Sequence, residues 1–123
     1  NAKLVDQEST TDFSASTLNF FVVPKITKSV LMQNYPNPFN PETWVPFSIK
    51  DAASVQIHIY DAMGRPIRTL DLGFRKSGNY ITPSKAAYWN GRNQLGEKVA
   101  SGVYFYQIRA GEFSSMKKMV ILK

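Results

Sequence analysis

The side chains best suited to chemistry in this sequence are a single histidine and nine carboxylates, and the chain has no cysteine. A histidine that works as a base or as a metal ligand needs a second group, which orients it or shares the metal. His58 has no second histidine and no thiol to work with, and alternation places it beside Gln56 and Tyr60 on the less apolar face of its run. We therefore interpret His58 as a structural or surface residue.

The carboxylates form no recognisable catalytic pair. Most of them lie in turns or in the polar N-terminal stretch, where they are routinely solvated: Asp6, Glu8, Asp12, Glu42, Asp51, Asp61, Asp71, Glu97 and Glu112. A glycosidase needs an acid and a base that face one cleft, and a domain this small offers little room for one. Asp61 is better placed to bond the amides of its own turn. With no phosphate-binding glycine loop, calcium loop or nucleophile elbow, the sequence predicts no enzymatic activity, no metal site and no cofactor.

Aromatic side chains suggest a different chemistry, because flat rings stack on the apolar faces of ligands. Tyr88, Trp89, Tyr104 and Tyr106 are the candidates, and such a platform would make the domain a carbohydrate-binding or surface-adhesion module of a secreted enzyme. Aromatics that alternate at period two usually face inward, however. We therefore expect Trp89 and the stripe Tyr104, Tyr106 and Ile108 to fill a core, and keep the carbohydrate module as the alternative function.

The formal net charge of +6 raises the question of an acidic partner. The cations are scattered, in small groups such as Arg65/Arg68, Arg75/Lys76 and Lys117/Lys118, and no known nucleic-acid-binding motif accompanies them. We expect a solvated basic surface and no nucleic acid, while an anionic cell surface or lipopolysaccharide fits the charge equally well. No apolar run approaches the roughly 20 residues that a membrane helix needs.

Alternation of apolar and polar residues predicts an all-β fold. About seven short strands, with turn signals between them, indicate an Ig-like antiparallel β-sandwich. Pro46 interrupts the first alternating run and predicts a strand that is bulged or at a sheet edge, while Gly64 suits a hairpin loop with one positive φ. The residues expected inside are Val45, Phe47, Ile49, Val55, Ile57, Ile59, Trp89, Tyr104, Tyr106 and Ile108.

The chain divides into a polar stretch and one domain. Residues 1–17 are expected to be a linker or the end of a preceding module, and residues 18–123 the domain itself, with a candidate strand at Leu18–Val23. The sequence starts at Asn1 without a signal-peptide pattern, which we interpret as a fragment or a processed product.

The most distinctive segment runs from Asn34 to Thr43 and is punctuated by prolines. Each proline fixes its own φ, removes an amide donor and pushes the preceding residue into extended geometry. We expect a stiff loop whose asparagine side chains bond nearby backbone groups. Its motif residues are Asn34, Pro36, Asn37, Pro38, Asn40 and Pro41.

Residues 31–123 resemble the C-terminal type A sorting domain of proteins exported by the bacterial type IX secretion system. The middle of the chain is also similar to the Ig-like domain of the flagellar hook-capping protein. Five segments carry the resemblance, namely residues 31–43, the hairpin 59–70, the tryptophan turn 89–93, and the last two strands at 102–111 and 117–123. The family more often has Asp where Asn90 stands, and Asn favours the same turn.

The resemblance implies transport rather than catalysis. Such domains follow a passenger, fold in the periplasm, are recognised by the outer-membrane secretion machinery, and bring the passenger to the cell surface or the medium. A sortase-like protease then usually removes them and often attaches the passenger to anionic lipopolysaccharide. The stretch Asp6–Ser16 is the expected cleavage zone, and the candidates for translocon recognition are Lys117, Lys118, Lys123, Gly102 and Tyr104.

The last strand, Phe113–Lys123, combines apolar and cationic residues. Met119 and Ile121 on one side and Val120 and Leu122 on the other predict burial on both faces near its end. Its three lysines are expected outside, because long cationic side chains are hardly ever buried unpaired. Either the secretion machinery reads them, or they only blunt an exposed edge strand against aggregation.

Overall fold

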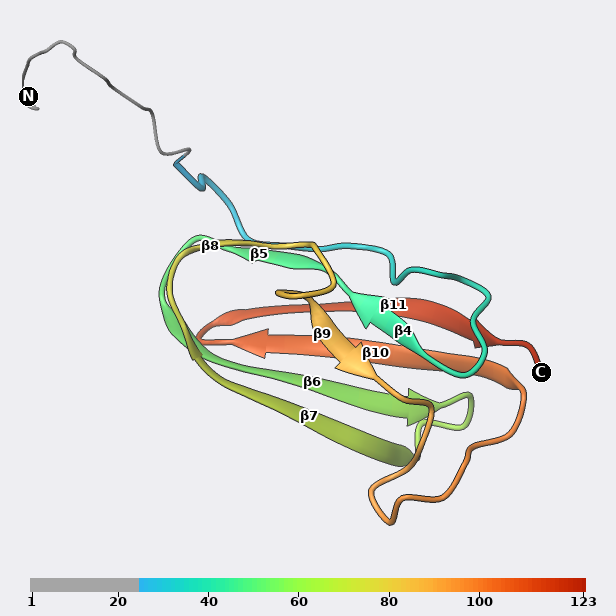
Figure 1. Ribbon diagram of the computed structural model, residues 1–123. Helices are drawn as coiled ribbons and strands as arrows, with labels where there is room; N and C mark the ends of the chain where they lie inside the picture. The colour runs from blue at the N-terminus through green and yellow to red at the C-terminus, as the bar shows by residue number, and fades with distance from the viewer. Residues whose placement is uncertain (1–24) are drawn as a thin grey trace, which may run out of the picture.

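The computed structural model describes residues 25–123, which contain nine strands and no helix (Figure 1). The expected linker at residues 1–17, the candidate strand at Leu18–Val23 and the cleavage zone at Asp6–Ser16 lie outside the described residues.

The larger layer is a four-stranded antiparallel sheet. Its strands follow the order β11 (Phe113–Ile121), β10 (Gly102–Ala110), β6 (Ala53–Asp61) and β7 (Pro66–Arg75). In the middle of the sheet Tyr106 of β10 lies opposite Ile59 of β6 on one side and Lys117 of β11 on the other. β11 and β7 are therefore the two edges of this sheet.

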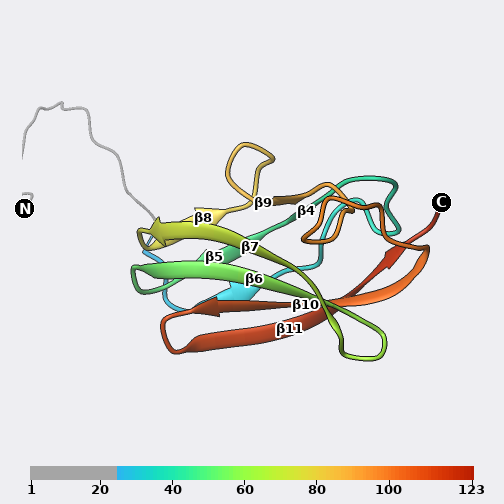
Figure 2. The same ribbon diagram turned by 90° about the horizontal axis from the view of Figure 1, so that it is seen from below.

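The second layer is made of shorter strands. One sheet has the order β3 (Val30–Leu31), β5 (Phe47–Ile49) and β8 (Gly78–Tyr80), and β4 (Thr43–Val45) pairs with β9 (Ala87–Trp89). Figures 1 and 2 show this layer lying against one face of the four-stranded sheet. The predicted all-β, Ig-like antiparallel β-sandwich is confirmed. The sequence predicts about seven strands, and the structure has more within residues 25–123 because the run at 43–49 is divided and β3 was not anticipated.

Pro46 is the point at which the chain passes from one sheet to another. It lies between β4, which pairs with β9, and β5, which pairs with β3 and β8. Proline has no amide to donate, so a ladder is interrupted where it stands. The expectation of an edge strand holds for β4, which has one neighbour in a two-stranded sheet, but is wrong for β5, which is the central strand of its sheet.

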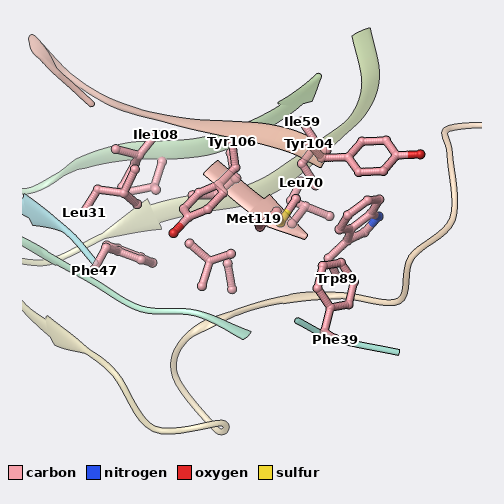
Figure 3. Packing of buried hydrophobic residues seen from close by; sticks show 14 of the residues in the cluster. Leu31, Phe39, Phe47, Ile59, Leu70, Trp89, Tyr104, Tyr106, Ile108 and Met119 are labelled. Carbon is pink, nitrogen blue, oxygen red and sulfur yellow. The ribbon is translucent and has the colours of Figure 1, made fainter. Parts of the chain in front are cut away.

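The core lies between the two layers (Figure 3). Each of the ten residues predicted to lie inside is at most 6% exposed, and Trp89 is completely buried. The sequence did not single out six further members of the core, Leu31, Phe39, Leu70, Ala87, Val99 and Ala110. Burial of one large apolar side chain contributes about 1.5–3 kcal/mol, so this cluster accounts for much of what holds the layers together. The interpretation of Trp89 and the Tyr104 stripe as core residues is confirmed.

The hairpin between β6 and β7 is organised by Asp61. Its Oδ1 accepts hydrogen bonds from the amides of Met63 and Arg65, both at 2.9 Å, and its Oδ2 accepts one from the Arg65 guanidinium at 2.7 Å. These bonds hold the pKa of Asp61 below its ordinary value, and the bond from the Arg65 amide has the largest effect. Gly64 follows with a φ of +82°, as a tight turn of this kind requires. The prediction that Asp61 bonds its turn is confirmed.

The last strand departs from its prediction on one face. Met119 and Ile121 are buried, as expected, and Val120 is half-buried. Leu122 is 64% exposed, so burial on both faces is wrong at this position. The reason is that β11 ends at Ile121 and no second layer covers its outer face there.

Candidate functional site

The proline loop (residues 34–43) lies along the free edge of β11 near its end (Figure 1). The Asn37 Oδ1 accepts a hydrogen bond from the Val120 amide at 2.9 Å. The Phe39 amide donates to the Val120 carbonyl at 3.0 Å, and the Leu122 amide donates to the Phe39 carbonyl at 3.1 Å. An unpaired strand edge is a template for association with other strands. The loop therefore closes the edge of β11 over its last residues.

Asn34 fixes the beginning of the proline loop from within, since it is only 2% exposed. Its amide donates to the Tyr106 hydroxyl at 2.9 Å, and its Nδ2 donates to the Thr43 Oγ1 at 2.9 Å and to the Pro36 carbonyl at 3.2 Å. The Asn34 Oδ1 accepts a hydrogen bond from the Gln33 Nε2 at 2.6 Å. Buried polar groups need such partners, and the prediction that asparagines organise this loop is confirmed for Asn34 and Asn37.

Tyr106 joins the proline loop to the core of the sandwich. Besides accepting the Asn34 amide, its hydroxyl donates to the Met32 carbonyl at 2.7 Å. Burial raises the pKa of Tyr106 to about 12, although the bond from the Asn34 backbone acts in the opposite direction. The phenol therefore stays neutral in the folded protein over the physiological pH range.

The other half of the proline loop meets the tryptophan turn (residues 89–93). Phe39 is buried, and its ring centroid lies 5.6 Å from that of Trp89, as seen at one end of the core in Figure 3. Gly91 has a φ of +76°, and a Cβ at this position would lie 2.5 Å from the Pro41 carbonyl oxygen. Both the backbone conformation and the space therefore require glycine.

Three of the segments that carry the family resemblance thus form one structural unit, the end cluster. It consists of the proline loop, the tryptophan turn and the last residues of β11 with the residues that follow. Figure 2 shows these segments at the same end of the sandwich, next to the C-terminus. All three X-Pro peptide bonds of the loop that follow Tyr35, Asn37 and Asn40 are cis.

Lys117 and Lys118 point to opposite faces of β11. Lys117 lies opposite the buried Tyr106 and is half-buried, whereas Lys118 lies opposite Phe105 and is exposed. The Lys118 carbonyl accepts a hydrogen bond from the Gln33 Nε2 at 2.8 Å, which ties down its backbone, and within residues 25–123 its ammonium makes no hydrogen bond. A charge that points inward on an edge strand is a known device against edge-to-edge association, and Lys117 has that position.

Lys123 lies apart from these two lysines. Its Nζ donates to the Val99 carbonyl, and its amide donates to the Ser101 Oγ at 3.2 Å. Together with Arg92 and Lys98, it lines a cavity of about 370 Å³. The structure therefore distributes the three predicted recognition lysines over two places, the edge of β11 and this cavity.

Gly102 and Tyr104, the other two recognition candidates, lie at the start of β10. Gly102 lies opposite Ile121 and has a φ of +149°. Tyr104 is 6% exposed, its hydroxyl donates to the Ala100 carbonyl at 2.8 Å, and burial raises the pKa of Tyr104. Its ring packs edge-on against Trp89 with centroids 6.0 Å apart. Direct contact of a partner with the Tyr104 ring does not fit its burial, and the ring is part of the core.

Among the four aromatic candidates for a ligand platform, only Tyr88 is exposed, at 46%. Its ring lies 5.5 Å from that of Trp44, and Trp44 stacks on Tyr35 with centroids 6.2 Å apart. The Tyr88 hydroxyl donates to the Glu42 carboxylate at 2.7 Å, and this bond raises the pKa of Tyr88. An aromatic row on this face therefore exists, but it has different members from those expected.

His58 has the surroundings of a structural residue. Its Nδ1 lies 3.3 Å from the Thr69 Oγ1, and its buried Nε2 has no hydrogen-bond partner within residues 25–123. No group of three or more histidine or carboxylate side chains in that part of the chain could hold a metal ion. Within the same residues, no helix has the length and apolar character needed to cross a membrane.

Phe39, Arg92 and Lys98 belong to this region but were not singled out from the sequence. Phe39 is an isolated apolar residue among prolines and asparagines, and that isolation was a usable signal for an anchor. Arg92 and Lys98 form an antiparallel bridge that brings two cations of one loop together. The glycines at positions 91 and 96 indicate turns, but not which side chains the folded loop presents.

Two solved structures from Porphyromonas gingivalis are similar to this chain. The crystal structure of dimeric latent PorU has a TM-score of 0.56 and 21% sequence identity, over 82% of this chain and 10% of PorU. The structure of PorZ, described as an essential bacterial surface component of the type-IX secretion system, has a TM-score of 0.49 and 24% identity, over 74% and 11%. The chain thus spans about a tenth of the length of each, and at this identity the likeness to PorU speaks for the fold alone. No curated protein matches the chain.

A protein family is matched more directly. Residues 42–112 match the FlgD Ig-like domain, a segment that runs from the end of the proline loop to the turn after β10. The match covers more than half of the chain and takes in the hairpin and the tryptophan turn. The matched segment contains strands β4 to β10 and leaves out β3 and β11. The chain therefore belongs to the FlgD Ig-like domain family.

Proposed function

We propose that this Ig-like domain is a non-catalytic C-terminal sorting domain that directs an attached passenger through the outer membrane by the type IX secretion system. Its partners are then an N-terminal passenger, the outer-membrane secretion machinery and a sortase-like protease, and anionic lipopolysaccharide is the acceptor of the released passenger. The domain passes through the periplasm and reaches the cell surface or the medium. A role in transport also fits a small domain that consists almost entirely of a packed core and turns.

The observation that supports this proposal best is the end cluster. Segments of the sorting-domain pattern that lie far apart in the sequence are held together by the Asn37–Val120 hydrogen bond and the Phe39–Trp89 contact. The loop, the turn and the strand of the sorting-domain pattern together form one surface. This explains why the pattern extends over all three. A core residue alone would need only apolar character.

Within the end cluster, the exposed lysines are the groups that a translocon would read. Lys118 is exposed on the outer face of β11, Lys123 is exposed just after the end of β11, and Lys117 lies half-buried on the inner face. Charged side chains on a rigid strand give a partner a defined electrostatic pattern. We accordingly assign recognition first to Lys118 and Lys123, with Lys117 as the edge-blunting residue.

The alternative function, a carbohydrate-binding or surface-adhesion module, has less support. Three of its four expected platform residues, Trp89, Tyr104 and Tyr106, are buried in the core and cannot stack on a ligand. Exposed Tyr88 with half-buried Trp44 and Tyr35 remains as a short aromatic row. A saturable glycan ligand without any effect on export would favour this alternative.

Export of a fused reporter tests the sorting proposal. The 123-residue chain is fused behind a reporter and produced in a host that has the secretion machinery, and the reporter is measured in medium, on cells and in the periplasm. The variant Lys117/Lys118/Lys123→Ala is compared with Lys50/Lys76/Lys85→Ala, which removes the same charge from exposed positions elsewhere. Surface lysines change stability by about 0.5 kcal/mol or less each, so both variants should melt near the parent.

The outcomes separate recognition from simple protection of the edge. Recognition predicts that only the first variant leaves the reporter in the periplasm. Edge protection predicts normal export of both variants, with the first one less soluble. Unchanged export together with unchanged melting and solubility would refute both roles for these lysines. Mass spectrometry of the exported reporter then shows whether a protease has cut within residues 1–17.

A further inference from the structure

A basic cavity opens between the proline loop and the tryptophan turn. It has a volume of about 370 Å³, and its walls come from all three segments of the end cluster and from the loop between β9 and β10. Three of its residues are cations: Arg92, Lys98 and Lys123. No aspartate or glutamate side chain belongs to its lining, and the Glu42 carboxylate accepts a hydrogen bond from the hydroxyl of the lining residue Tyr88 at 2.7 Å.

The placement of these cations is unfavourable for the domain by itself. Arg92 and Lys98 face one another in an antiparallel bridge, and like charges opposite one another in such a pair are destabilising. Within residues 25–123, neither they nor Lys123 forms a salt bridge with a carboxylate. An arrangement that costs stability and lacks internal compensation is the kind found at sites that bind an external group. The positive charge of these three side chains favours the binding of an anion.

The positions of the cations are fixed by the fold. The Arg92 amide donates to the Asn90 Oδ1 at 3.1 Å, and the Arg92 carbonyl accepts the Trp89 Nε1 at 2.9 Å. The Arg92 guanidinium uses one nitrogen on the Gly96 carbonyl at 2.8 Å, which leaves other donors of the five available. Lys123 is held by the Val99 carbonyl and keeps further N–H donors. Donors held in place before binding lose little entropy when an anion arrives.

The size of the cavity and its uncharged lining residues indicate the kind of molecule to which the anionic group belongs. A cavity of this size exceeds the needs of a bare phosphate or carboxylate and falls in the range of small-molecule sites. The side-chain nitrogens (Nδ2) of Asn40 and Asn90 make no hydrogen bonds within residues 25–123, so they can donate to the hydroxyl groups of a ligand. Tyr88 adds an exposed ring at the rim. Amides, a ring and cations together match a sugar that bears an anionic group.

We infer that this cavity binds an anionic monosaccharide unit, with its phosphate or carboxylate group between Lys98, Lys123 and Arg92 and its hydroxyl groups against Asn40 and Asn90. The site is independent of the sorting proposal, because it is defined by the geometry of one cavity and not by transport. It also differs from a flat aromatic platform, since recognition depends on charge.

Titration of the whole 123-residue chain with defined probes tests the inference. Glucose 6-phosphate, glucuronate, glucose and inorganic phosphate are added separately, and binding is followed by calorimetry and by the NMR shifts of the Asn90 and Lys98 amides. We expect one or both anionic sugars to bind at least about tenfold more tightly than glucose, as charge-assisted hydrogen bonds suggest. The two anionic probes show whether phosphate or carboxylate is preferred, and binding should weaken as salt is raised from about 0.01 M to about 1 M.

Matched variants locate the site. Lys98→Gln should weaken binding of the anionic sugar about tenfold without any loss of stability, because it removes one of two like charges that face one another, whereas Lys50→Gln, which removes an exposed lysine outside the cavity, should have no effect on binding. Equal binding by both variants would overturn the location. Equal affinity for glucose and the anionic sugars would overturn the role of charge, and equal affinity for inorganic phosphate would overturn the assignment of a sugar. Because export is not measured, failure here leaves the sorting proposal untouched.

Discussion

The side-chain oxygen of Asn37 accepts a hydrogen bond of 2.9 Å from the amide of Val120, across 83 positions of sequence. This bond replaces a strand neighbour that β11 lacks, because β11 is the edge of its sheet. The neighbouring Phe39 adds two backbone hydrogen bonds to the same edge and buries its ring beside Trp89. The proline loop is therefore both an edge cover and an anchor.

Asn37→Ala should uncover this edge. Loss of the bond leaves the Val120 amide without its partner, which costs about 1 kcal/mol in free energy of unfolding. Hydrogen exchange at Val120 should become faster, and the protein should associate at lower concentration. The control is Asn40→Ala in the same loop, since Asn40 is exposed and its side chain makes no hydrogen bond within residues 25–123. Equal exchange rates in the two variants would contradict the edge-cover role.

Trp89→Ala should unfold the domain or weaken it severely. Trp89 is completely buried, and replacing such a large aromatic residue by alanine costs about 3–5 kcal/mol, a large part of a small domain's stability. Chemical denaturation monitored by circular dichroism measures the loss. Tyr88→Ala, one position away and 46% exposed, should cost about 1 kcal/mol or less. Similar losses in both variants would show that Trp89 is not the anchor of this end.

Gly91→Ala should be more destabilising than Gly96→Ala. Both glycines have positive φ, +76° and +85°, so alanine costs roughly 1–2 kcal/mol at either position through its backbone conformation. Only at Gly91 would the new Cβ also lie 2.5 Å from the Pro41 carbonyl oxygen, while nothing lies within 4 Å of it at Gly96. The difference in free energy of unfolding between the two variants measures the contact between the tryptophan turn and the proline loop. No difference would mean that this contact adapts without cost.

Tyr106 should make the domain sensitive to alkaline pH. Its pKa is about 12 in the folded protein against 10.0 for an ordinary tyrosine, so the unfolded chain loses the proton first as pH rises. Stability from this group is complete below pH 10 and disappears as pH rises towards 12, because the unfolded state then binds fewer protons than the folded state. Tyr106→Phe should be less stable at neutral pH by about 1–3 kcal/mol, since it leaves the buried Asn34 amide unpaired.

The test compares melting temperatures of the parent and Tyr106→Phe between about pH 8 and about pH 12. Lysine titration affects both proteins equally, so the gap between the two curves isolates Tyr106. The gap should narrow with rising pH. Parallel curves would show that the phenol does not titrate differently in the folded and unfolded states.

The sequence by itself determined the fold class and the inside of the sandwich. Strict alternation over 55–60 and 104–108 assigned each side chain to a face, because successive residues of a strand point to opposite sides. The six predicted core residues of these two runs are buried for this reason, and the other four predicted core residues are buried as well. The roles of Asp61 and Gly64 in their turn could also be predicted from the sequence, because an Asx-type turn depends only on residues close together in the chain.

Tertiary structure alone decided which segments meet. Pro46 shows that a strand ladder is interrupted, but only the second layer makes it a junction between two sheets. Leu122 is as apolar as a core residue, yet it is exposed because β11 ends at Ile121 and no second layer covers the outer face there. The closure of β11 by Asn37 and the meeting of Arg92, Lys98 and Lys123 depend on contacts between distant residues. Local sequence patterns determine the side of a strand to which a side chain points. The residue from a distant segment that it contacts is determined by how the whole chain packs.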